Sequence, residues 1–262
     1  MYQEARRIGP TLADLVAQLS LRTHPSEIIL VDDGSSDDTV GAAERALSAL
    51  GERGKVRIRT VLHGRNRGKG AAVRTGLAAA NGTWRLMMDA DNACGVGEVD
   101  KLLAACKPGV GLVAGSREVS GAMVTARASR KFAGAVFRGV LGVLGLNLLR
   151  DTQCGFKLYR ADLANQIVKH AKEDGFAFDL EHLLIVKAAA LRVEEVGVRW
   201  EHKDGGTVRP IADGMRMVQQ AARIRARWLG GGSGVERLPR TMPPCERVLV
   251  EVKSAAGAGA AL

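Results

Sequence analysis

The chain has 262 residues, is 46% hydrophobic and carries a formal net charge of +10. This apolar content supplies a sizeable core and excludes an intrinsically disordered protein. No apolar run is long enough to cross a bilayer, no secretory signal peptide is visible, and the four cysteines lack paired spacing, so we expect a soluble or peripheral protein with reduced thiols. The charge favours an anionic partner, but composition alone does not distinguish nucleic acid, a membrane surface and a phosphorylated substrate.

The first half of the chain alternates predicted helices and strands. The elements are, in order, a helix that starts at Pro10 and ends before Pro25, a strand over 27–31, a helix with Asp37 and Asp38 in its first turn, a strand over 55–63, a helix over 68–82, a strand over 84–88, a helix over 97–106 and a strand over 111–115. Such alternation predicts an α/β fold, with a mostly parallel sheet and helices on both faces.

The second half is predicted to be richer in helix. It adds a Gly-rich apolar helix over 131–149, a strand within 152–160, helices over 161–172 and 178–190, a strand over 192–202 and a basic amphipathic helix over 215–228. The helix over 131–149 fits two interpretations, an ordinary core helix or one that lies in a bilayer interface with Arg138 reaching the head groups. We assign residues 1–229 to one domain and residues 230–262 to a linker and a flexible tail.

Two pairs of aspartates follow predicted strands. Asp32 and Asp33 close the first strand, and Asp89 and Asp91 close the third. Ligands of parallel sheets bind at the carboxyl ends of strands, and carboxylates spaced i, i+2 can present oxygens to one Mg²⁺ or Mn²⁺ that is shared with phosphates. A single pair of this kind is more often a polar turn before a helix, so its meaning depends on the residues around it.

The stretch "HGRNRGKGAAVRTG" places basic residues beside glycines at a predicted helix start. Arg65, Arg67 and Lys69 flank Gly68 and Gly70. Free backbone N–H groups and the helix dipole favour an anion at such a point, although the spacing does not match a Walker A loop. Together with the two acidic strand ends, this turn predicts a nucleoside diphosphate site.

These motifs carry a family resemblance. "YQEARRI", "EIILVDDGSSDDT", "NRGKGAAVRTG" and "MMDADNA", in this order and spacing, resemble family 2 glycosyltransferases with the GT-A, Rossmann-like fold. "RDTQCGFKLYR", "DGFAFDLEHLL" and "GTVRP" are similar to the dolichyl-phosphate β-glucosyltransferase branch, and the resemblance covers about residues 2–229. The family carries a strand before the tyrosine motif that this sequence does not contain, so we expect a sheet without its first strand.

The resemblance implies a site for a nucleotide sugar and a metal. The residues implied for the nucleotide sugar are Tyr2, Glu4, Asp32, Asp33, Lys69 and Asp89. Asp89 and Asp91 would hold Mg²⁺ or Mn²⁺, and Asp91 would act in catalysis through the metal that bridges the diphosphate. The sequence therefore predicts that the apolar strand ending at Asp89 is a rigid mount for a cation.

The resemblance also implies residues on the acceptor side. Asp179 matches the position of a catalytic base in many family members, Glu181 is its rival, and a helix-start carboxylate without catalytic role is the alternative. A phosphate acceptor has a second pKa of about 6 and needs no strong base, so we expect Asp179 to orient groups or to tune charge. The residues implied for the acceptor phosphate are Arg117, Arg127, Arg130 and Gln153, with Lys131 in support.

The implied function is the inverting transfer of glucose from UDP-glucose to dolichyl phosphate. The product would be dolichyl β-D-glucosyl phosphate for protein N-glycosylation, made by a peripheral protein at the cytosolic face of the endoplasmic reticulum membrane. Two alternatives stay open, another polyprenyl-phosphate glycosyltransferase of mannosyl or bacterial type and an inactive truncated paralogue. Nucleic acid is not an expected partner, because no basic stretch carries interleaved aromatic residues or a known motif.

Overall fold

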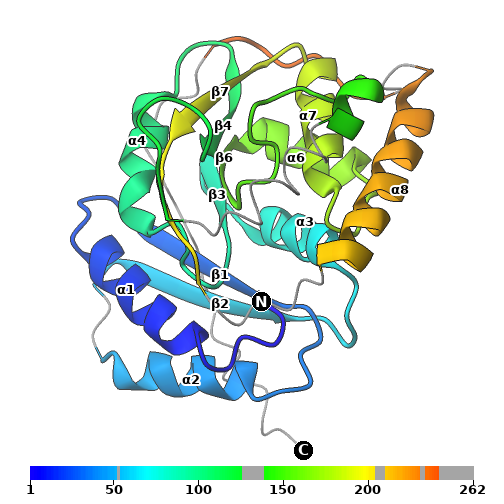
Figure 1. The fold of residues 1–262 in the computed structure, drawn as a ribbon. Coiled ribbons are helices and arrows are strands. Elements are labelled where there is room, and N and C mark those ends of the chain that lie inside the picture. The colour runs from blue at the N-terminus through cyan, green and yellow to red at the C-terminus, as the bar shows by residue number, and fades with distance from the viewer. Residues whose placement is uncertain (52–53, 126–138, 204–209, 231–233, 242–262) are drawn as a thin grey trace, which may run out of the picture.

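A computed structural model describes residues 1–51, 54–125, 139–203, 210–230 and 234–241 (Figure 1). Its elements are α1 (Ile8–Ser20), β1 (Ser26–Asp32), α2 (Thr39–Ala49), β2 (Val56–Leu62), α3 (Lys69–Ala79), β3 (Trp84–Met88), the 3₁₀ turn η1 (Val96–Glu98), α4 (Val99–Ala104), β4 (Val110–Ser116), β5 (Met123–Thr125), β6 (Phe156–Arg160), α6 (Ala161–His170), α7 (Phe178–Ala188), β7 (Arg192–Gly197), β8 (Arg199–Glu201) and α8 (Pro210–Trp228). The predicted α/β class is confirmed.

The strands form three hydrogen-bonded groups. β1 pairs with β2 in parallel, β3, β6, β4 and β7 form a four-stranded sheet in that order, and β5 pairs with β8 in parallel. β6 is antiparallel to both β3 and β4, whereas β4 and β7 are parallel. The sheet is thus mixed at β6, a direction that the residue pattern of a strand buried along its whole length does not reveal.

Helices cover both faces of the first strands. Figure 1 shows α1 and α2 on one side of the β1–β2 pair and α3 on the other. On α1, the residues Ile8, Leu12, Leu15 and Val16 recur at helical spacing and are buried in one apolar cluster with Ile28 and Leu30 of β1. A second cluster joins α6 and α7 to the four-stranded sheet. The strand ends that carry the aspartates are therefore mounted on covered, apolar layers.

The helix predicted over 131–149 ends earlier in the structure than the sequence indicates. Its first residues, 131–138, lie outside the described residues. Gly145 has a positive φ of 65°, and the Leu146 N–H donates to Leu141 O at 2.8 Å, so the helix has ended by this point. Leu141 and Leu146 are fully buried in a cluster with Leu180 of α7 and Ile224 of α8. The glycine permits the reversal that returns the chain to the core.

Residues 234–241 also differ from the prediction, which placed them in a linker and tail. Val235 and Leu238 pack against the α6–α7 cluster. The Leu238 N–H donates to Ala189 O at 3.0 Å, and the Gly109 N–H donates to Arg240 O at 2.7 Å. The two apolar side chains place this stretch on the core.

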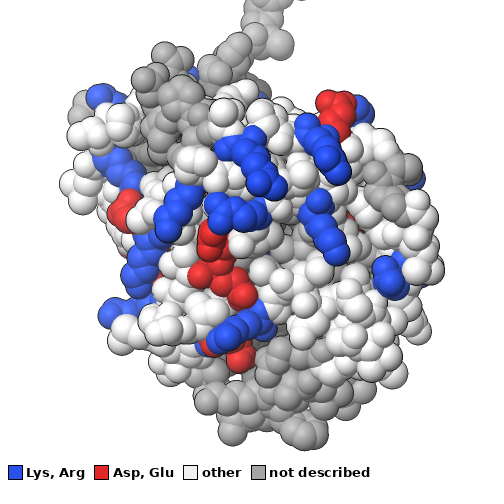
Figure 2. Space-filling model, turned by 90° about the horizontal axis from the view of Figure 1, so that it is seen from above, with Lys and Arg blue, Asp and Glu red and all other residues white. Residues whose placement is uncertain are grey.

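The surface is basic, as the composition predicts. On the face shown in Figure 2, Lys and Arg side chains are spread around a central group of acidic side chains, and a few further acidic side chains lie apart from it. In the described part of the chain, no helix combines the length and the apolar character that crossing a bilayer requires.

Glu181 anchors α8 from inside the fold. Its carboxylate is fully buried and accepts hydrogen bonds from the N–H groups of Lys172 (2.7 Å) and Glu173 (2.6 Å). Its other oxygen pairs with Arg227 Nη1 at 2.6 Å and accepts from Trp228 Nε1 at 3.4 Å, both on α8. Glu181, the alternative candidate for a catalytic base, therefore uses both carboxylate oxygens in hydrogen bonds that hold the fold together.

We expect Glu181→Ala to lower the free energy of unfolding by about 3 kcal/mol, because it removes the acceptor of the buried Glu173 N–H, of the part-buried Lys172 N–H and of the Arg227 guanidinium. Thermal denaturation followed by circular dichroism should show a fall in Tm of roughly 6–12 °C. Glu194→Ala removes an exposed carboxylate paired with Arg192 at 3.5 Å and is the matched control. Equal Tm values for the two variants would contradict the anchoring role.

Candidate active site

The two aspartates at the end of β1 are enclosed by their own loops. Asp33 accepts hydrogen bonds from the N–H groups of Arg67 (2.9 Å) and Gly68 (2.8 Å), and its side chain is 5% exposed. Asp32 accepts from the N–H (2.9 Å) and the hydroxyl (2.6 Å) of Ser35. Both carboxylates therefore hold loops at the strand end, and Asp33 attaches the glycine-rich turn to β1.

The N–H groups at the start of α3 are also occupied. Those of Gly70 and Ala71 donate to Asp174 O at 2.7 and 3.3 Å. A Cβ atom at Gly70 would lie 2.4 Å from Glu173 O, so only glycine permits this close approach. Asp33 and Asp174 thus supply acceptors for four N–H groups of this turn, and the binding of a diphosphate by the turn stays a prediction.

The first residues of the chain lie beside the end of β1. The α-amino group of Met1 donates to Val31 O at 2.5 Å, and the Asp33 N–H donates to Met1 O at 2.9 Å. Tyr2, 37% exposed, and Glu4 line the same cavity as Asp33. Burial raises the pKa of Glu4. The structure thus brings the residues expected around the uridine to one strand end.

Asp89 and Asp91 lie at the end of β3. Lys69 Nζ pairs with Asp89 Oδ1 at 2.6 Å, and the other Asp89 oxygen lies so close to Gly155 that a Cβ atom there would be 2.0 Å away. Asp91 Oδ1 accepts the Ala93 N–H at 3.0 Å. Burial opposes the positive charge of Lys69, but Asp89, with smaller contributions from Asp179 and Asp91, raises the pKa of the lysine.

This donor set fits a hard divalent cation. The side chains of Asp89 and Asp91 are 36% and 26% exposed and both residues line the cavity. Arg7 Nη1 lies 3.9 Å from Asp91 Oδ2, so positive charge already faces the pair. Within the described ranges, no group of three metal-ligating side chains occurs. Mg²⁺ commonly takes one or two carboxylates together with water and substrate phosphates, which is what this pair offers.

Asp179, at the start of α7, is held by a buried lysine. Lys157 Nζ contacts Asp179 Oδ1 at 2.6 Å and also donates to Thr152 O (2.9 Å) and Cys154 O (2.8 Å). Burial raises the pKa of Asp179, while Lys157 and Lys69 oppose that shift. The charge of Asp179 also acts on Lys69. Asp179 therefore belongs to the same charge cluster as the aspartate pair on β3.

The structure describes two of the four residues expected to bind the acceptor phosphate, Arg117 and Gln153. Arg117 is bound on two sides by Asp151, through Nε at 2.7 Å and Nη2 at 2.8 Å, and its guanidinium lies 5.4 Å from the centre of the Trp200 ring. Gln153 Nε2 is buried and has no hydrogen-bond partner among the described residues. The other two residues expected here, Arg127 and Arg130, lie outside the described residues.

Two buried residues of the site were not predicted. Lys157 is 1% exposed in the middle of an apolar strand, and a lysine in that setting is a signal because buried lysines are paired. His63 Nδ1 contacts Asp33 Oδ1 at 2.7 Å and its Nε2 contacts Thr75 Oγ1 at 2.9 Å. The sequence signal for His63 was its position directly after β2, the strand that pairs with β1. Burial raises the pKa of Cys154 to about 11, so this residue is a protonated thiol at neutral pH.

Comparison with known proteins identifies the family. The model of glycosyl transferase family 2 matches residues 1–168. The chain belongs to glycosyl transferase family 2. This family assignment confirms the resemblance drawn from the aspartate motifs, and the molecule is a glycosyltransferase.

Curated relatives of this glycosyltransferase cover most of its length. It is 31% identical over 245 residues to a dolichyl-phosphate beta-glucosyltransferase of Dictyostelium discoideum, covering 88% of this chain and 73% of that protein. It is 33% identical over 243 residues to the Mus musculus protein of the same name, covering 88% and 74%. The Homo sapiens protein of that name is 30% identical over 249 residues, covering 90% and 76%.

Solved structures share the fold. Glucosyl-3-phosphoglycerate synthase from Mycobacterium tuberculosis, in complex with Mn²⁺, UDP-glucose and phosphoglyceric acid, matches with a TM-score of 0.64 at 18% identity, over 86% of this chain and 77% of that one. Mannosyl-3-phosphoglycerate synthase from Rubrobacter xylanophilus matches with a TM-score of 0.59 at 19% identity, over 88% and 72%. At these identities the likeness establishes the fold of the glycosyltransferase.

We expect Gly155→Ala to weaken Mn²⁺-dependent UDP binding about tenfold while changing stability by less than about 1 kcal/mol, because the new methyl group displaces the flexible Asp89 carboxylate rather than backbone. Calorimetric titration and thermal denaturation measure the two quantities. Gly139→Ala, with nothing within 4 Å of the new Cβ atom, is the control. A Gly155→Ala variant with unchanged UDP affinity would show that the position of Asp89 does not matter.

Proposed function

We propose that this glycosyltransferase transfers glucose from UDP-glucose to dolichyl phosphate with inversion, forming dolichyl β-D-glucosyl phosphate. Relatives named for this activity are 30–33% identical over most of the chain. The observation that carries the proposal is the partly exposed carboxylate pair at the end of β3, Asp89 and Asp91, with Lys69 on Asp89. This arrangement suits a nucleoside diphosphate leaving group.

On the donor side, residues beside the ends of β1 and β3 bind different parts of the nucleotide sugar. Tyr2 and Glu4 contact the uridine, while Asp32 and Asp33 act by holding the loops around it. Bound Mg²⁺ or Mn²⁺, held by Asp89 and Asp91, supplies positive charge against the departing diphosphate. Lys69 stays on Asp89 and adds a fixed cation that reduces repulsion between the carboxylates and the diphosphate.

On the acceptor side, the lipid phosphate is itself the nucleophile. With a second pKa of about 6 it is largely a dianion at neutral pH, so no group has to remove a proton from it. The residues proposed to bind it are Arg117, Arg127, Arg130 and Gln153. Gln153 offers an unpartnered amide donor, and Arg117 is oriented by Asp151.

Asp179 is proposed to orient the acceptor side rather than to act as a base. Lys157 holds its Oδ1, so the carboxylate keeps a fixed position and its charge is balanced. For a lipid acceptor we place the reaction at the cytosolic face of the endoplasmic reticulum membrane, with the protein bound peripherally through its basic surface.

The donor preference can be measured directly. With dolichyl phosphate present and Mn²⁺ in the buffer, we expect UDP release from UDP-glucose and no comparable turnover of UDP-galactose, UDP-N-acetylglucosamine or GDP-mannose. Product analysis should give the β-linked lipid sugar. Turnover of GDP-mannose without turnover of UDP-glucose would reject the glucose assignment, and turnover of no donor despite UDP binding would favour an inactive paralogue.

Lys157→Gln should shift the acidic limb of the kcat pH profile to higher pH. The lysine opposes the burial that raises the pKa of Asp179, so its removal raises that pKa further and the carboxylate protonates earlier as the pH falls. Lys101→Gln, at an exposed lysine paired with Glu98, is the control. An acidic limb that stays in place in a folded Lys157→Gln variant would mean that the ionisation of Asp179 is not required.

A further inference from the structure

His63 lies beside Asp33 because β1 and β2 are parallel and in register. Their register pairs Asp32 with Leu62, so the next residues along the two strands, Asp33 and His63, meet at the same end of the pair. The His63 N–H donates to Asp32 O at 2.9 Å, which continues the ladder by one residue. The backbone therefore fixes the point from which the imidazole extends, directly beside the Asp33 carboxylate.

Both ring nitrogens of His63 make a contact. Nδ1 lies 2.7 Å from Asp33 Oδ1, and Nε2 lies 2.9 Å from Thr75 Oγ1, on α3. A carboxylate only accepts hydrogen bonds, so we assign a proton to Nδ1, which donates it to Asp33. The side chains of His63 and Asp33 are each 5% exposed, so little water reaches this bond. The imidazole thus joins the end of β1 to α3.

Asp33 passes this restraint on to the glycine-rich turn. Its Oδ1 accepts the Arg67 N–H at 2.9 Å as well as the imidazole, and its Oδ2 accepts the Gly68 N–H at 2.8 Å. The two backbone donors belong to the turn that is being held, whereas the imidazole follows β2. His63 therefore sets the orientation of the carboxylate independently of the turn.

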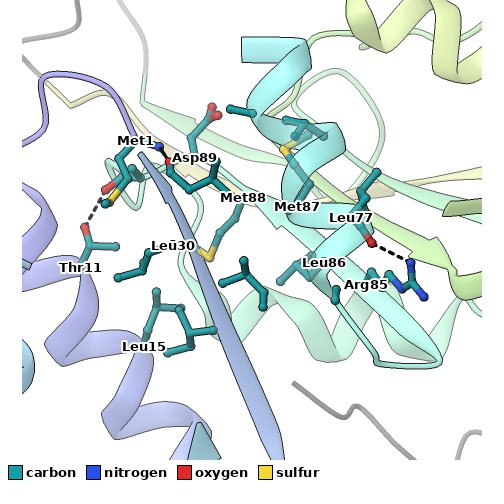
Figure 3. Close-up of a pocket in the computed structure, with 18 of the residues that line it drawn as sticks. Met1, Thr11, Leu15, Leu30, Leu77, Arg85, Leu86, Met87, Met88 and Asp89 are labelled. Carbon is teal, nitrogen blue, oxygen red and sulfur yellow. Dashed lines mark hydrogen bonds between the residues drawn. The ribbon is translucent and has the colours of Figure 1, made fainter. Parts of the chain in front are cut away.

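The turn held by Asp33 carries Lys69 to the aspartate of β3. Gly68 directly precedes α3, whose first residue is Lys69. Lys69 Nζ pairs with Asp89 Oδ1 at 2.6 Å. Asp33, Lys69 and Asp89 line one cavity of about 920 Å³. Figure 3 shows Asp89 and, on α3, Leu77 in the wall of this cavity, so the position of α3 shapes the space that a donor would enter.

We propose that His63 is a positioning residue of the donor site, which orients Asp33 and, through it, the turn that presents Lys69 to the diphosphate of the nucleotide sugar. This inference rests on the proposed binding of UDP-glucose. His63 holds the turn and α3 at two points, through Asp33 and through Thr75. Thr75 lies more than one helical turn beyond Lys69, so we assign the effect on the diphosphate to the bond with Asp33.

The two bonds of the imidazole can be separated by two substitutions. The side-chain nitrogen of asparagine is as many bonds from Cβ as Nδ1, and that of glutamine is as many as Nε2. His63→Asn therefore keeps a donor for Asp33 and loses the bond to Thr75, whereas His63→Gln does the reverse. Each variant loses one hydrogen bond and part of the ring, so a merely structural role predicts the same result for both. Thr75→Val, which removes only the partner of Nε2, is the matched control.

Hydrogen exchange of the Arg67 and Gly68 amides, measured without ligand, is the first readout, and the affinity for UDP with Mn²⁺ is the second. In His63→Gln we expect both amides to exchange at least about tenfold faster and UDP to bind about tenfold more weakly, because Asp33 has lost its fixed donor. In His63→Asn and Thr75→Val both quantities should stay within about threefold of those of the unsubstituted chain.

Equal exchange and equal UDP affinity in His63→Gln and His63→Asn would overturn the proposal. So would faster exchange in His63→Gln with unchanged UDP affinity, because the turn would then not present Lys69 to the diphosphate. Failure of the unsubstituted chain to bind UDP would instead reject the proposed function, and the exchange rates alone would then accept or reject His63 as the residue that positions the turn.

Discussion

The site depends on the balance of charge around Lys69 and Lys157. Three carboxylates, on Asp89, Asp91 and Asp179, act on Lys69, and two of them are in direct contact with a lysine. Like charges that lie near one another repel. Lys69 and Lys157 each hold one of these carboxylates, Asp89 and Asp179, in an ion pair of 2.6 Å, and so fix the positions of both around the cavity.

Two residues near β6 hold these carboxylates in position. Only glycine fits at position 155, because the Asp89 carboxylate occupies the space that a Cβ atom would need. β6 places Lys157 under Asp179, and it delivers Gly155 to Asp89 through the ladder with β3. One antiparallel strand in the sheet therefore connects Asp89, at the end of β3, with Asp179, at the start of α7.

Much of this architecture could be predicted from the sequence. Strand β3 and the aspartates after it follow directly from an apolar run that ends in acidic residues, and α1 follows from its apolar spacing. The acceptors of the N–H groups in the glycine-rich turn could not be predicted. Asp174 lies about 100 residues from that turn in the chain, and only the folded structure brings its carbonyl to Gly70. The burial of Lys157 and Glu181 depends on tertiary partners in the same way.

Asp91 and its metal are the central claim, and one titration tests it most directly. UDP is titrated into the chain and into its Asp91→Ala variant, each with Mn²⁺ and with EDTA, and Asp100→Ala serves as a control at an exposed aspartate paired with Arg22. The account predicts that Mn²⁺ tightens UDP binding by the chain and by Asp100→Ala at least about tenfold, roughly 1.4 kcal/mol, and that Asp91→Ala loses this gain. An equal gain from Mn²⁺ in Asp91→Ala would contradict it.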